Sequence, residues 1–316
     1  MRKYCVMFAG QSVQEEGMCR ELWKLKPARE ILERLKPSLG EDLEYITTGM
    51  PADQLALTFN AQRAIHAHHL GHWFAFKALH PELELDGAIG HSMGVVAALV
   101  AAEAMSVEDS GAFIRARAQA FYDICKGFSE PMGLAAVSTD FLEDAVARIE
   151  SVPGVSLALH NTIGRGTAGG RMADLEALAS KIEQEGWSIK LKILRVEGPY
   201  HTAAFSPCKP ALAKALERVA IQAPRVPVFM GSSGKAETEP ARIRELLVRQ
   251  ADALERHFEA VWAAYDHGCR HFLEVAHKPQ PVKWIPDQLQ DEDGNVLADT
   301  TALALETAQL DSPLPL

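Results

Sequence analysis

The pentapeptide GHSMG at residues 90–94 places a serine where a chain can expose a nucleophile. It follows an apolar run that ends at Ile89 and precedes VVAALVAAEAM, a segment typical of a helix. A strand, a tight Gly-x-Ser-x-Gly turn and a helix form a nucleophile elbow, in which the glycines let the backbone pass without Cβ clashes. The first N–H groups of the helix would face the negative charge that develops in acyl transfer. We therefore predict that Ser92 is a nucleophile.

A serine hydroxyl needs a base to remove its proton, and the chain has 12 histidines. His201 is the best candidate, because it lies in RVEGPYHTAAFSP, between a predicted strand and the next predicted helix. This places it in a loop where the chain re-enters the main sheet, although an ordinary loop histidine would show the same pattern. His91 adjoins the serine but is expected to point away from it at the turn.

Four further histidines fall on one predicted helix, and His68 and His72 have the i,i+4 spacing that metal ligands also use. No Asp or Glu stands at a supporting position among them. We therefore expect a helix with partly exposed histidines and no metal site. The four residues are His66, His68, His69 and His72.

One arginine lies on the apolar side of a predicted helix. Arg117 shares its stripe with Phe113 and Phe121, whereas Arg115 faces the other side. Arginine is almost never buried without an anionic partner, because removing its charge from water is costly. An internal carboxylate is one possible partner. The functional alternative is a guanidinium that binds a substrate carboxylate through two parallel hydrogen bonds, which a simple esterase does not need.

Strand and helix patterns alternate around these residues, which predicts a largely parallel sheet with the elbow at its carboxyl edge. The first buried strand is YCVMFA at 4–9, and Ser106 is a candidate N-cap for the helix that carries Arg117. Further helices are predicted over 61–79, 107–123, 210–220, 241–250 and 254–266, and further strands over 226–231 and 269–275.

Between 133 and 195 the pattern changes to β-α-β-β-α-β, the order of a ferredoxin-like unit that can form a small subdomain of its own. The strands are predicted over 133–138, 155–160, 166–170 and 188–196, and the helices over 141–150 and 174–186. From about residue 286 the chain turns polar and acidic, and we expect an extended or partly disordered tail.

The overall composition is globular, with 47% hydrophobic and 23% charged residues among 316. The net charge of −10 argues against a nucleic-acid partner, and no apolar run reaches the roughly 18 residues of a membrane span. The five cysteines are scattered and form no Cys-x-x-Cys pair, which favours reduced thiols in a cytoplasm. The N-terminal stretch MRKYCVMFAG leads into a strand and lacks the pattern of a signal peptide.

Several segments together resemble the malonyl-CoA:acyl carrier protein acyltransferases, a family that includes the acyltransferase domains of polyketide synthases. Their order and spacing match the family over about residues 4–285, and the combination is specific although each piece alone is not. The segments are FAGQSVQEEGM at 8–18, GHSMG at 90–94, Arg117, EGPYHT at 197–202 and LLVRQ at 246–250.

The resemblance implies a two-step transfer through a Ser-His dyad. Ser92 would attack the thioester of malonyl-CoA, and His201 would take its proton and later activate the phosphopantetheine thiol of an acyl carrier protein. In the family this histidine is oriented by a backbone carbonyl, at the position of Gln250 here. Coenzyme A enters as the thioester substrate, and neither a bound cofactor nor a metal is expected.

The resemblance also implies residues around the substrate. The backbone N–H groups of Gln11 and Met93 would form the oxyanion hole, and Arg117 would bind the malonyl carboxylate. Asn161 matches an asparagine of the family motif beside the site. A bulky residue at the position of Tyr200 goes with malonyl in the family, and a small one with methylmalonyl.

The element pattern and the resemblance together predict an α/β fold. Its large part would be an α/β-hydrolase-like subdomain with a parallel sheet, formed by residues 1–127 and 197–286. Residues 128–196 would be an inserted ferredoxin-like subdomain, and 287–316 a C-terminal tail. The expected partners are malonyl-CoA and an acyl carrier protein, with no nucleic acid and no membrane.

The chain departs from the family around the pocket rim. Val95 follows the elbow glycine where the family has Glu, and FAGQSVQ replaces F-P-G-Q-G-S-Q. The motif LHNTIGR has Leu159 and Arg165 where the family has Asn and Gln, and Ala276 and His277 replace Gly-Pro. These changes affect acyl selectivity and partner identity more than reaction class. They favour a free-standing acyltransferase of secondary metabolism over the housekeeping enzyme of fatty acid synthesis.

Alternative functions remain open. A hydrolase that clears acyl chains from carriers, or a transferase of another acyl group, would share the fold but leave the charge of Arg117 unpaired. A non-catalytic carrier-binding protein would have no use for Ser92 and His201. An α/β-hydrolase esterase would need an acid behind the histidine. An acidic carrier protein would dock on basic residues, for which Lys190, Lys192 and Arg195 are candidates, although alternating residues on a solvent-exposed strand show the same pattern.

Overall fold

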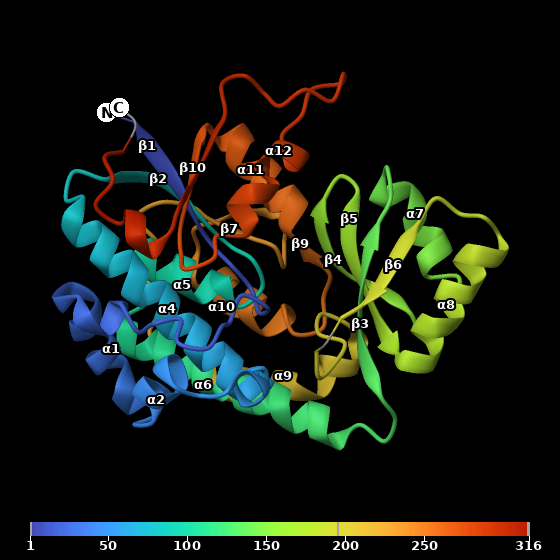
Figure 1. Ribbon diagram of the computed structural model, residues 1–316, viewed down its shortest axis with the longest axis horizontal. Helices are drawn as coiled ribbons and strands as arrows, with labels where there is room; N and C mark the ends of the chain where they lie inside the picture. The colour runs from blue at the N-terminus through green and yellow to red at the C-terminus, as the bar shows by residue number, and fades with distance from the viewer. Residues whose placement is uncertain (1, 195, 315–316) are drawn as a thin grey trace.

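The computed structural model describes residues 2–194 and 196–314. Its larger sheet has six strands in the order β11-β10-β1-β2-β7-β8, and all neighbours are parallel except β7 and β8 (Figure 1). This confirms the predicted, largely parallel sheet. The strands are β1 (Lys3–Phe8), β2 (Glu84–Gly90), β7 (Val228–Met230), β8 (Lys235–Glu237), β10 (His271–Val275) and β11 (Thr301–Leu305).

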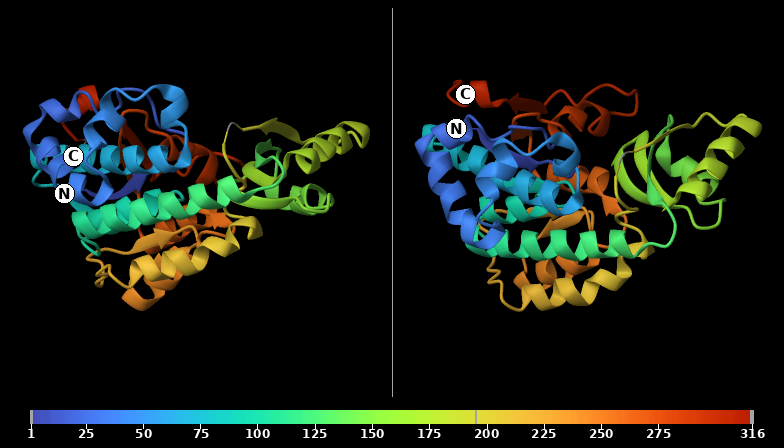
Figure 2. Two further views of the ribbon diagram at one scale, coloured as in Figure 1. Left: turned by 90° about the horizontal axis from the view of Figure 1, so that it is seen from below. Right: turned by 60° about the horizontal axis from the view of Figure 1, so that its bottom comes forward.

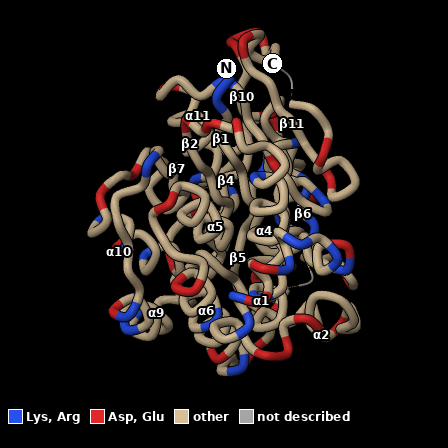
Figure 3. The backbone as a smooth tube through the Cα atoms, turned by 90° about the vertical axis from the view of Figure 1, so that its left-hand side faces the viewer, with Lys and Arg blue, Asp and Glu red and all other residues tan. Residues whose placement is uncertain are grey.

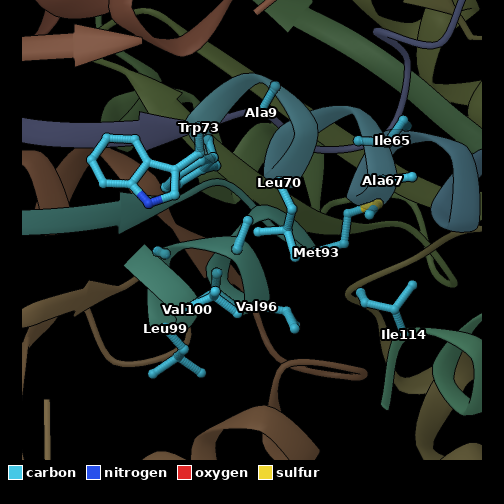
Figure 4. Close-up of a cluster of buried hydrophobic side chains, with 14 of the residues drawn as sticks. Ala9, Ile65, Ala67, Leu70, Trp73, Met93, Val96, Leu99, Val100 and Ile114 are labelled. Carbon is cyan, nitrogen blue, oxygen red and sulfur yellow. The ribbon is translucent and has the colours of Figure 1, made fainter. Parts of the chain in front are cut away.

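Helices cover both faces of this sheet, because successive side chains of a buried strand point to opposite sides. On β1, Tyr4, Val6 and Phe8 pack with one group of helices, whereas Cys5 and Met7 pack with the other. The first group is α1 (Lys26–Leu39), α2 (Leu43–Thr48), α3 (Ala52–Leu55), α4 (Thr58–Leu79), α5 (Gly94–Ala101), α6 (Val107–Gly127), α9 (Lys209–Leu216) and α10 (Pro240–Arg249). The second is α11 (His257–His267) and α12 (Ile285–Gln288). Figure 4 shows Leu70 and Trp73 of α4 beside Val96 and Leu99 of α5.

A long helix connects the two sheets. The side chain of Ser106 accepts a hydrogen bond from the Asp109 N–H at 3.0 Å, so the predicted N-cap of α6 is confirmed. From there α6 runs under the large sheet toward the smaller one (Figure 2). Arg117 therefore lies on a helix that runs from the apolar core to the junction of the two sheets.

The smaller sheet is ordered β6-β3-β5-β4-β9. Its first four strands are antiparallel, and they follow the β-α-β-β-α-β element order predicted from the sequence. The fifth strand, β9, comes from a later segment and pairs in parallel with β4. The elements are β3 (Met132–Ser138), α7 (Leu142–Ile149), β4 (Ser156–Thr162), β5 (Arg165–Arg171), α8 (Met172–Gln184), β6 (Lys190–Ile193) and β9 (Glu255–Arg256).

The prediction of an extended or partly disordered tail is wrong for the stretch that follows the acidic segment. The run TALAL forms β11, which adds in parallel to β10 at the edge of the large sheet. Two histidines of the α4 region hold the residues beyond it, since His72 Nε2 lies 2.7 Å from Thr307 Oγ1 and His80 Nε2 lies 2.9 Å from the Leu310 carbonyl. An apolar segment beside an unpaired strand edge is more stable when it pairs as a further strand than when it stays exposed to water. The segment after β11 thus lies beside the large sheet (Figure 1).

The histidines of α4 are buried, which corrects the expectation of partial exposure. Their exposed fractions are 0–1%, because α4 is enclosed by other helices rather than lying at the surface. Burial lowers the pKa of His66 to about 3 and that of His72 to about 4. Within the described residues no group of three or more His, Cys, Asp or Glu side chains is arranged to hold a metal ion.

The surface agrees with a globular, acidic chain. Acidic and basic residues interleave along the outer helices and loops (Figure 3). Among the described residues, no helix combines the length and apolar character that a membrane crossing requires. All five cysteines are free thiols.

Candidate active site

The segment around Ser92 has the geometry of a nucleophile elbow. β2 ends at Gly90 and α5 begins at Gly94, with three residues between them. A Cβ on Gly90 would lie 2.0 Å from the Val95 nitrogen, and one on Gly94 would lie 2.4 Å from the Phe8 carbonyl oxygen, so neither position accepts a side chain. Ser92 itself has a φ of +50°, a left-handed conformation that is rare for a residue with a Cβ.

The structure brings Ser92, His201 and Gln250 together from three separate segments. The Ser92 Oγ lies 2.7 Å from His201 Nε2, and His201 Nδ1 lies 2.8 Å from the backbone carbonyl of Gln250. A neutral imidazole that donates through Nδ1 must accept through Nε2, which is the arrangement a base for the serine needs. Burial, with the charge of Arg117 as the next cause, lowers the pKa of His201 to about 3. The imidazole is therefore neutral at physiological pH.

Two backbone N–H groups beside the serine lack an acceptor. Gln11 lies in the turn after β1, and Met93 follows Ser92 at the start of α5. Neither N–H donates a hydrogen bond to any other part of the described chain. The N–H of Ser92 is instead occupied, because it donates to Glu255 Oε1 at 2.9 Å.

Arg117 is buried on the apolar stripe of α6, with 3% of its surface exposed, whereas Arg115 is exposed. Its Nη1 donates to Gln62 Oε1 at 2.6 Å, and its guanidinium lies 4.1 Å from the centre of the Phe121 ring. It forms no ion pair with any residue in the described ranges. Burial lowers its pKa to about 10, so it remains a cation at neutral pH. The internal carboxylate considered as an alternative partner is therefore not in contact with it.

A cavity of about 520 Å³ lies over the dyad and between the two sheets. One wall comes from the large sheet side and includes Gln11, Ser92 and His201. The opposite wall comes from the small sheet, where Leu134, Ala136 and Ser138 of β3 line the cavity, while Ala135 packs with α7 and α8 and Val137 contributes to both. The small-sheet residues include Leu134, Ala136, Ser138, Leu159, Asn161, Arg165, Thr167, Lys190, Leu191 and Lys192.

Asn161 and Tyr200 both line the cavity. The Asn161 Oδ1 lies 2.9 Å from His91 Nε2, so His91 points toward the small sheet and not toward the serine hydroxyl. The Tyr200 hydroxyl contacts Thr58 Oγ1, and its ring stacks on Phe121 at 5.8 Å. Lys190 and Lys192 lie at the cavity rim on β6, and Arg195 lies outside the described residues.

Two residues of this site are not predicted from the sequence. Gln62 is the hydrogen-bond partner of Arg117, and Glu255 accepts from the Ser92 backbone. Gln62 lies on the predicted 61–79 helix. Its only signal in the sequence is that it is a polar residue on a helix that other helices enclose. Glu255 stands in ADALERHF, where no periodic pattern marks a buried carboxyl, because its burial follows from the pairing of β9 with β4.

The chain belongs to the acyl transferase domain family, whose model matches residues 6–304. The malonyl CoA-acyl carrier protein transacylase of Haemophilus influenzae is 29% identical over 277 residues, which are 87% of this chain and 88% of that protein. The acyl-carrier-protein-S-malonyltransferase of Bartonella henselae aligns with a TM-score of 0.86 and 26% identity, over 98% of this chain and 97% of the other. The resemblance inferred from the sequence motifs is thereby confirmed.

The fold also extends to a multimodular enzyme. The acyltransferase domain from the second module of the salinomycin polyketide synthase aligns with a TM-score of 0.82 and 22% identity, over 98% of this chain and 70% of the other. This similarity concerns the mixed α/β fold with two sheets.

Proposed function

We propose that this protein transfers a malonyl group from malonyl-CoA to the phosphopantetheine thiol of an acyl carrier protein, through an ester on Ser92. The buried, cationic Arg117 carries the proposal, because its charge acts on His201 and it has no carboxylate partner in direct contact among the described residues. A substrate with a second, free carboxylate supplies that partner. The name of the Haemophilus relative supports the same donor and acceptor, and that of the Bartonella protein supports the same acyl group and acceptor.

In the proposed first half-reaction, the Ser92 hydroxyl attacks the thioester carbon and its proton passes to His201 Nε2. The Gln250 carbonyl holds the Nδ1–H and so keeps this nitrogen facing the serine. The free N–H groups of Gln11 and Met93 serve as donors for the oxyanion of the tetrahedral intermediate. When the intermediate collapses, coenzyme A leaves as the thiol with the proton from His201.

In the second half-reaction the chemistry runs in reverse with a different thiol. The phosphopantetheine thiol gives its proton to His201 and attacks the Ser92 ester. The bond from Ser92 Oγ to the malonyl carbon then breaks, His201 returns the proton to this oxygen, and the malonyl group leaves as a thioester of the carrier. Arg117 holds the malonyl carboxylate through both steps, so the acyl carbon is not free to turn toward water. Asn161 and Tyr200 shape the acyl end of the cavity, the first through His91 and the second through Phe121.

We also propose that the chain divides into two subdomains, and the architecture supports this division. Residues 1–127 and 197–286 would form an α/β-hydrolase-like subdomain, to whose sheet the C-terminal segment adds β11, and residues 128–196 would form a ferredoxin-like subdomain. The strand order β6-β3-β5-β4 within one continuous segment supports the second assignment. We further propose a place in polyketide or fatty acid assembly, and a cytoplasmic location that fits the five free thiols.

Intact-mass measurement after incubation with malonyl-CoA or acetyl-CoA tests the proposed function. The expected result is a malonyl adduct on Ser92 that a phosphopantetheinylated carrier protein removes. The Ser92→Ala protein should form no adduct. A stable acetyl adduct without a malonyl adduct would contradict the proposal, and hydrolysis of either adduct at the same rate with and without carrier would indicate an acyl hydrolase.

A further inference from the structure

A buried carboxyl group lies directly beneath the nucleophile elbow. Glu255 is fully buried, and its Oε1 accepts the backbone N–H of Ser92 at 2.9 Å. Its other oxygen, Oε2, accepts from the side-chain amide of Gln250 at 3.3 Å. A buried carboxylate is unfavourable unless hydrogen bonds satisfy it, so both contacts are needed to hold it there.

The Gln250 side chain closes a small network around the dyad. Its Nε2 also donates to the Ser92 carbonyl at 3.0 Å, and its own backbone carbonyl accepts from His201 Nδ1. We propose that Glu255 is a positioning residue for acyl transfer, whose carboxylate holds the backbone of the nucleophile and the side chain of Gln250 in register. The inference rests on the proposed acyl transfer, and Glu255 acts through these neighbours without touching the substrate.

Two features of the elbow explain why a fixed acceptor matters here. Ser92 is held at a φ of +50°, which costs free energy, so the surrounding contacts must stabilise it. The carboxylate also occupies the Ser92 N–H, whereas the N–H groups of Met93 and Gln11 have no acceptor among the described residues. Glu255 thus stabilises the backbone conformation that directs the Ser92 side chain, and it keeps the Ser92 N–H from acting as an oxyanion donor.

Glu255 also links the two sheets. Its backbone belongs to β9, which pairs with Leu159 and His160 of β4 in the small sheet, while its side chain reaches the elbow of the large sheet. Gly231, just after β7, makes room for the carboxyl, since a Cβ there would lie 2.1 Å from Glu255 Oε1. Three parts of the molecule therefore fix the position of the carboxyl group: the small sheet, the end of β7 and the elbow.

The charge of this carboxyl depends on its surroundings. Burial raises the pKa of Glu255 to about 7, and the charge of Arg117, which forms no ion pair with it, opposes that rise. Burial lowers the pKa of each neighbouring histidine below its ordinary value, so Glu255 is the group near the dyad that titrates around neutrality. These histidines are His91 at the elbow, His160 on β4, His201 before the 3₁₀ turn that leads into α9, and His257 at the start of α11.

The test uses the reaction of Ser92 with phenylmethanesulfonyl fluoride, which reports the positioning of the nucleophile whatever the natural acyl donor is. Glu255→Val should slow this labelling about 100-fold, the loss typical of a misplaced reacting group. Glu255→Gln keeps one acceptor but turns an NH₂ toward the Gln250 amide, so a decrease of about 10-fold is expected. Glu259→Gln makes the same change on a nearby carboxylate that pairs with Arg256, and it should label like the wild type.

A second variant moves the carboxyl without removing it. Gly231→Ala places a methyl group against Glu255 Oε1 and should slow labelling about as much as Glu255→Gln. In the double variant with Glu255→Val the methyl has no carboxyl to displace, so the two effects should not add. Full additivity, or labelling of Glu255→Val within twofold of wild type in a folded protein, overturns the proposal.

The pH dependence separates positioning from a merely structural role. Wild-type labelling should rise through about pH 7 as Glu255 ionises and gains full strength as an acceptor, and the Glu255→Gln protein should show no such rise. The same rise in both proteins overturns the proposal. If wild-type Ser92 reacts with the sulfonyl fluoride but not with malonyl-CoA, the proposed function fails and the positioning proposal is still decided by these rates. If Ser92 reacts with neither, both fail.

Discussion

The two walls of the cavity differ in chemistry. The wall on the large-sheet side presents Ser92 and His201, which are buried and hydrogen-bonded to each other, from the ends of strands and helices. The small-sheet wall mixes aliphatic side chains with hydroxyl and amide groups, and its cations include Lys190, Lys192 and Arg165. Parallel strands converge their carboxyl ends on one edge, whereas an antiparallel sheet offers a broad face of alternating side chains. We infer that the first wall performs the reaction and the second shapes and receives the substrate.

The largest expected difference between the two walls is measured by removing a serine hydroxyl from each. Ser92→Ala should lower malonyl transfer by at least about 10³-fold, because the covalent path is lost. Ser138→Ala, on β3 of the small sheet, removes the same hydroxyl from the opposite wall and should change the rate less than about threefold. Steady-state transfer to a carrier protein measures both, and similar losses would refute the division of labour.

Removal of the buried cation should change which acyl group is accepted. Arg117→Ala is expected to lower malonyl loading about 100-fold, since a charge-assisted bidentate contact contributes about 2–3 kcal/mol. Acetyl loading should be unchanged or faster, because acetyl has no carboxylate to pair. Arg115→Ala is the matched control on the exposed side of the same helix. Intact-mass time courses with both donors give the ratio, and an unchanged acyl preference would argue against a carboxylate clamp.

A milder effect is expected at the rim of the small sheet. Lys190→Glu on the edge strand β6 should raise the KM for an acidic carrier protein about 5-fold, and more at low salt, while the rate at saturating carrier stays the same. Lys235→Glu makes the same charge change on β8, an edge strand of the large sheet, and should have no effect. Titration of carrier protein at two ionic strengths separates the outcomes.

The smallest effect concerns stability in acid. The buried His66 and His72 have pKa values of about 3 and about 4 in the folded protein, below the ordinary 6.5. Their contribution is therefore complete above pH 6.5 and is lost as the pH falls, by about 1 kcal/mol per histidine between pH 6.5 and pH 5.5. Urea unfolding at the two pH values measures the loss, and His66→Gln should reduce it. The same stability at both values would contradict this linkage.

Local pattern was enough for much of the fold. The alternation of strands and helices, the β-α-β-β-α-β segment and the Ser106 cap all follow from residues close together in the chain, and the structure contains each of them. The tail was misjudged because its acidic start outweighed the short run TALAL, whose pairing partner β10 lies in a different segment. The α4 histidines were misjudged for a related reason, since their burial depends on helices that surround α4 from elsewhere.

The elbow, the buried face of α6 and the family could all be predicted from the sequence, because each depends on spacing within a short segment or on the order of such segments. The packing of distant segments decided that His201 meets Ser92, that Arg117 meets Gln62 and no carboxylate among the described residues, and that Glu255 lies under Ser92. These contacts join residues 109, 55 and 163 positions apart. Periodicity reports which side of an element is buried, but the partner it is buried against depends on how distant segments pack.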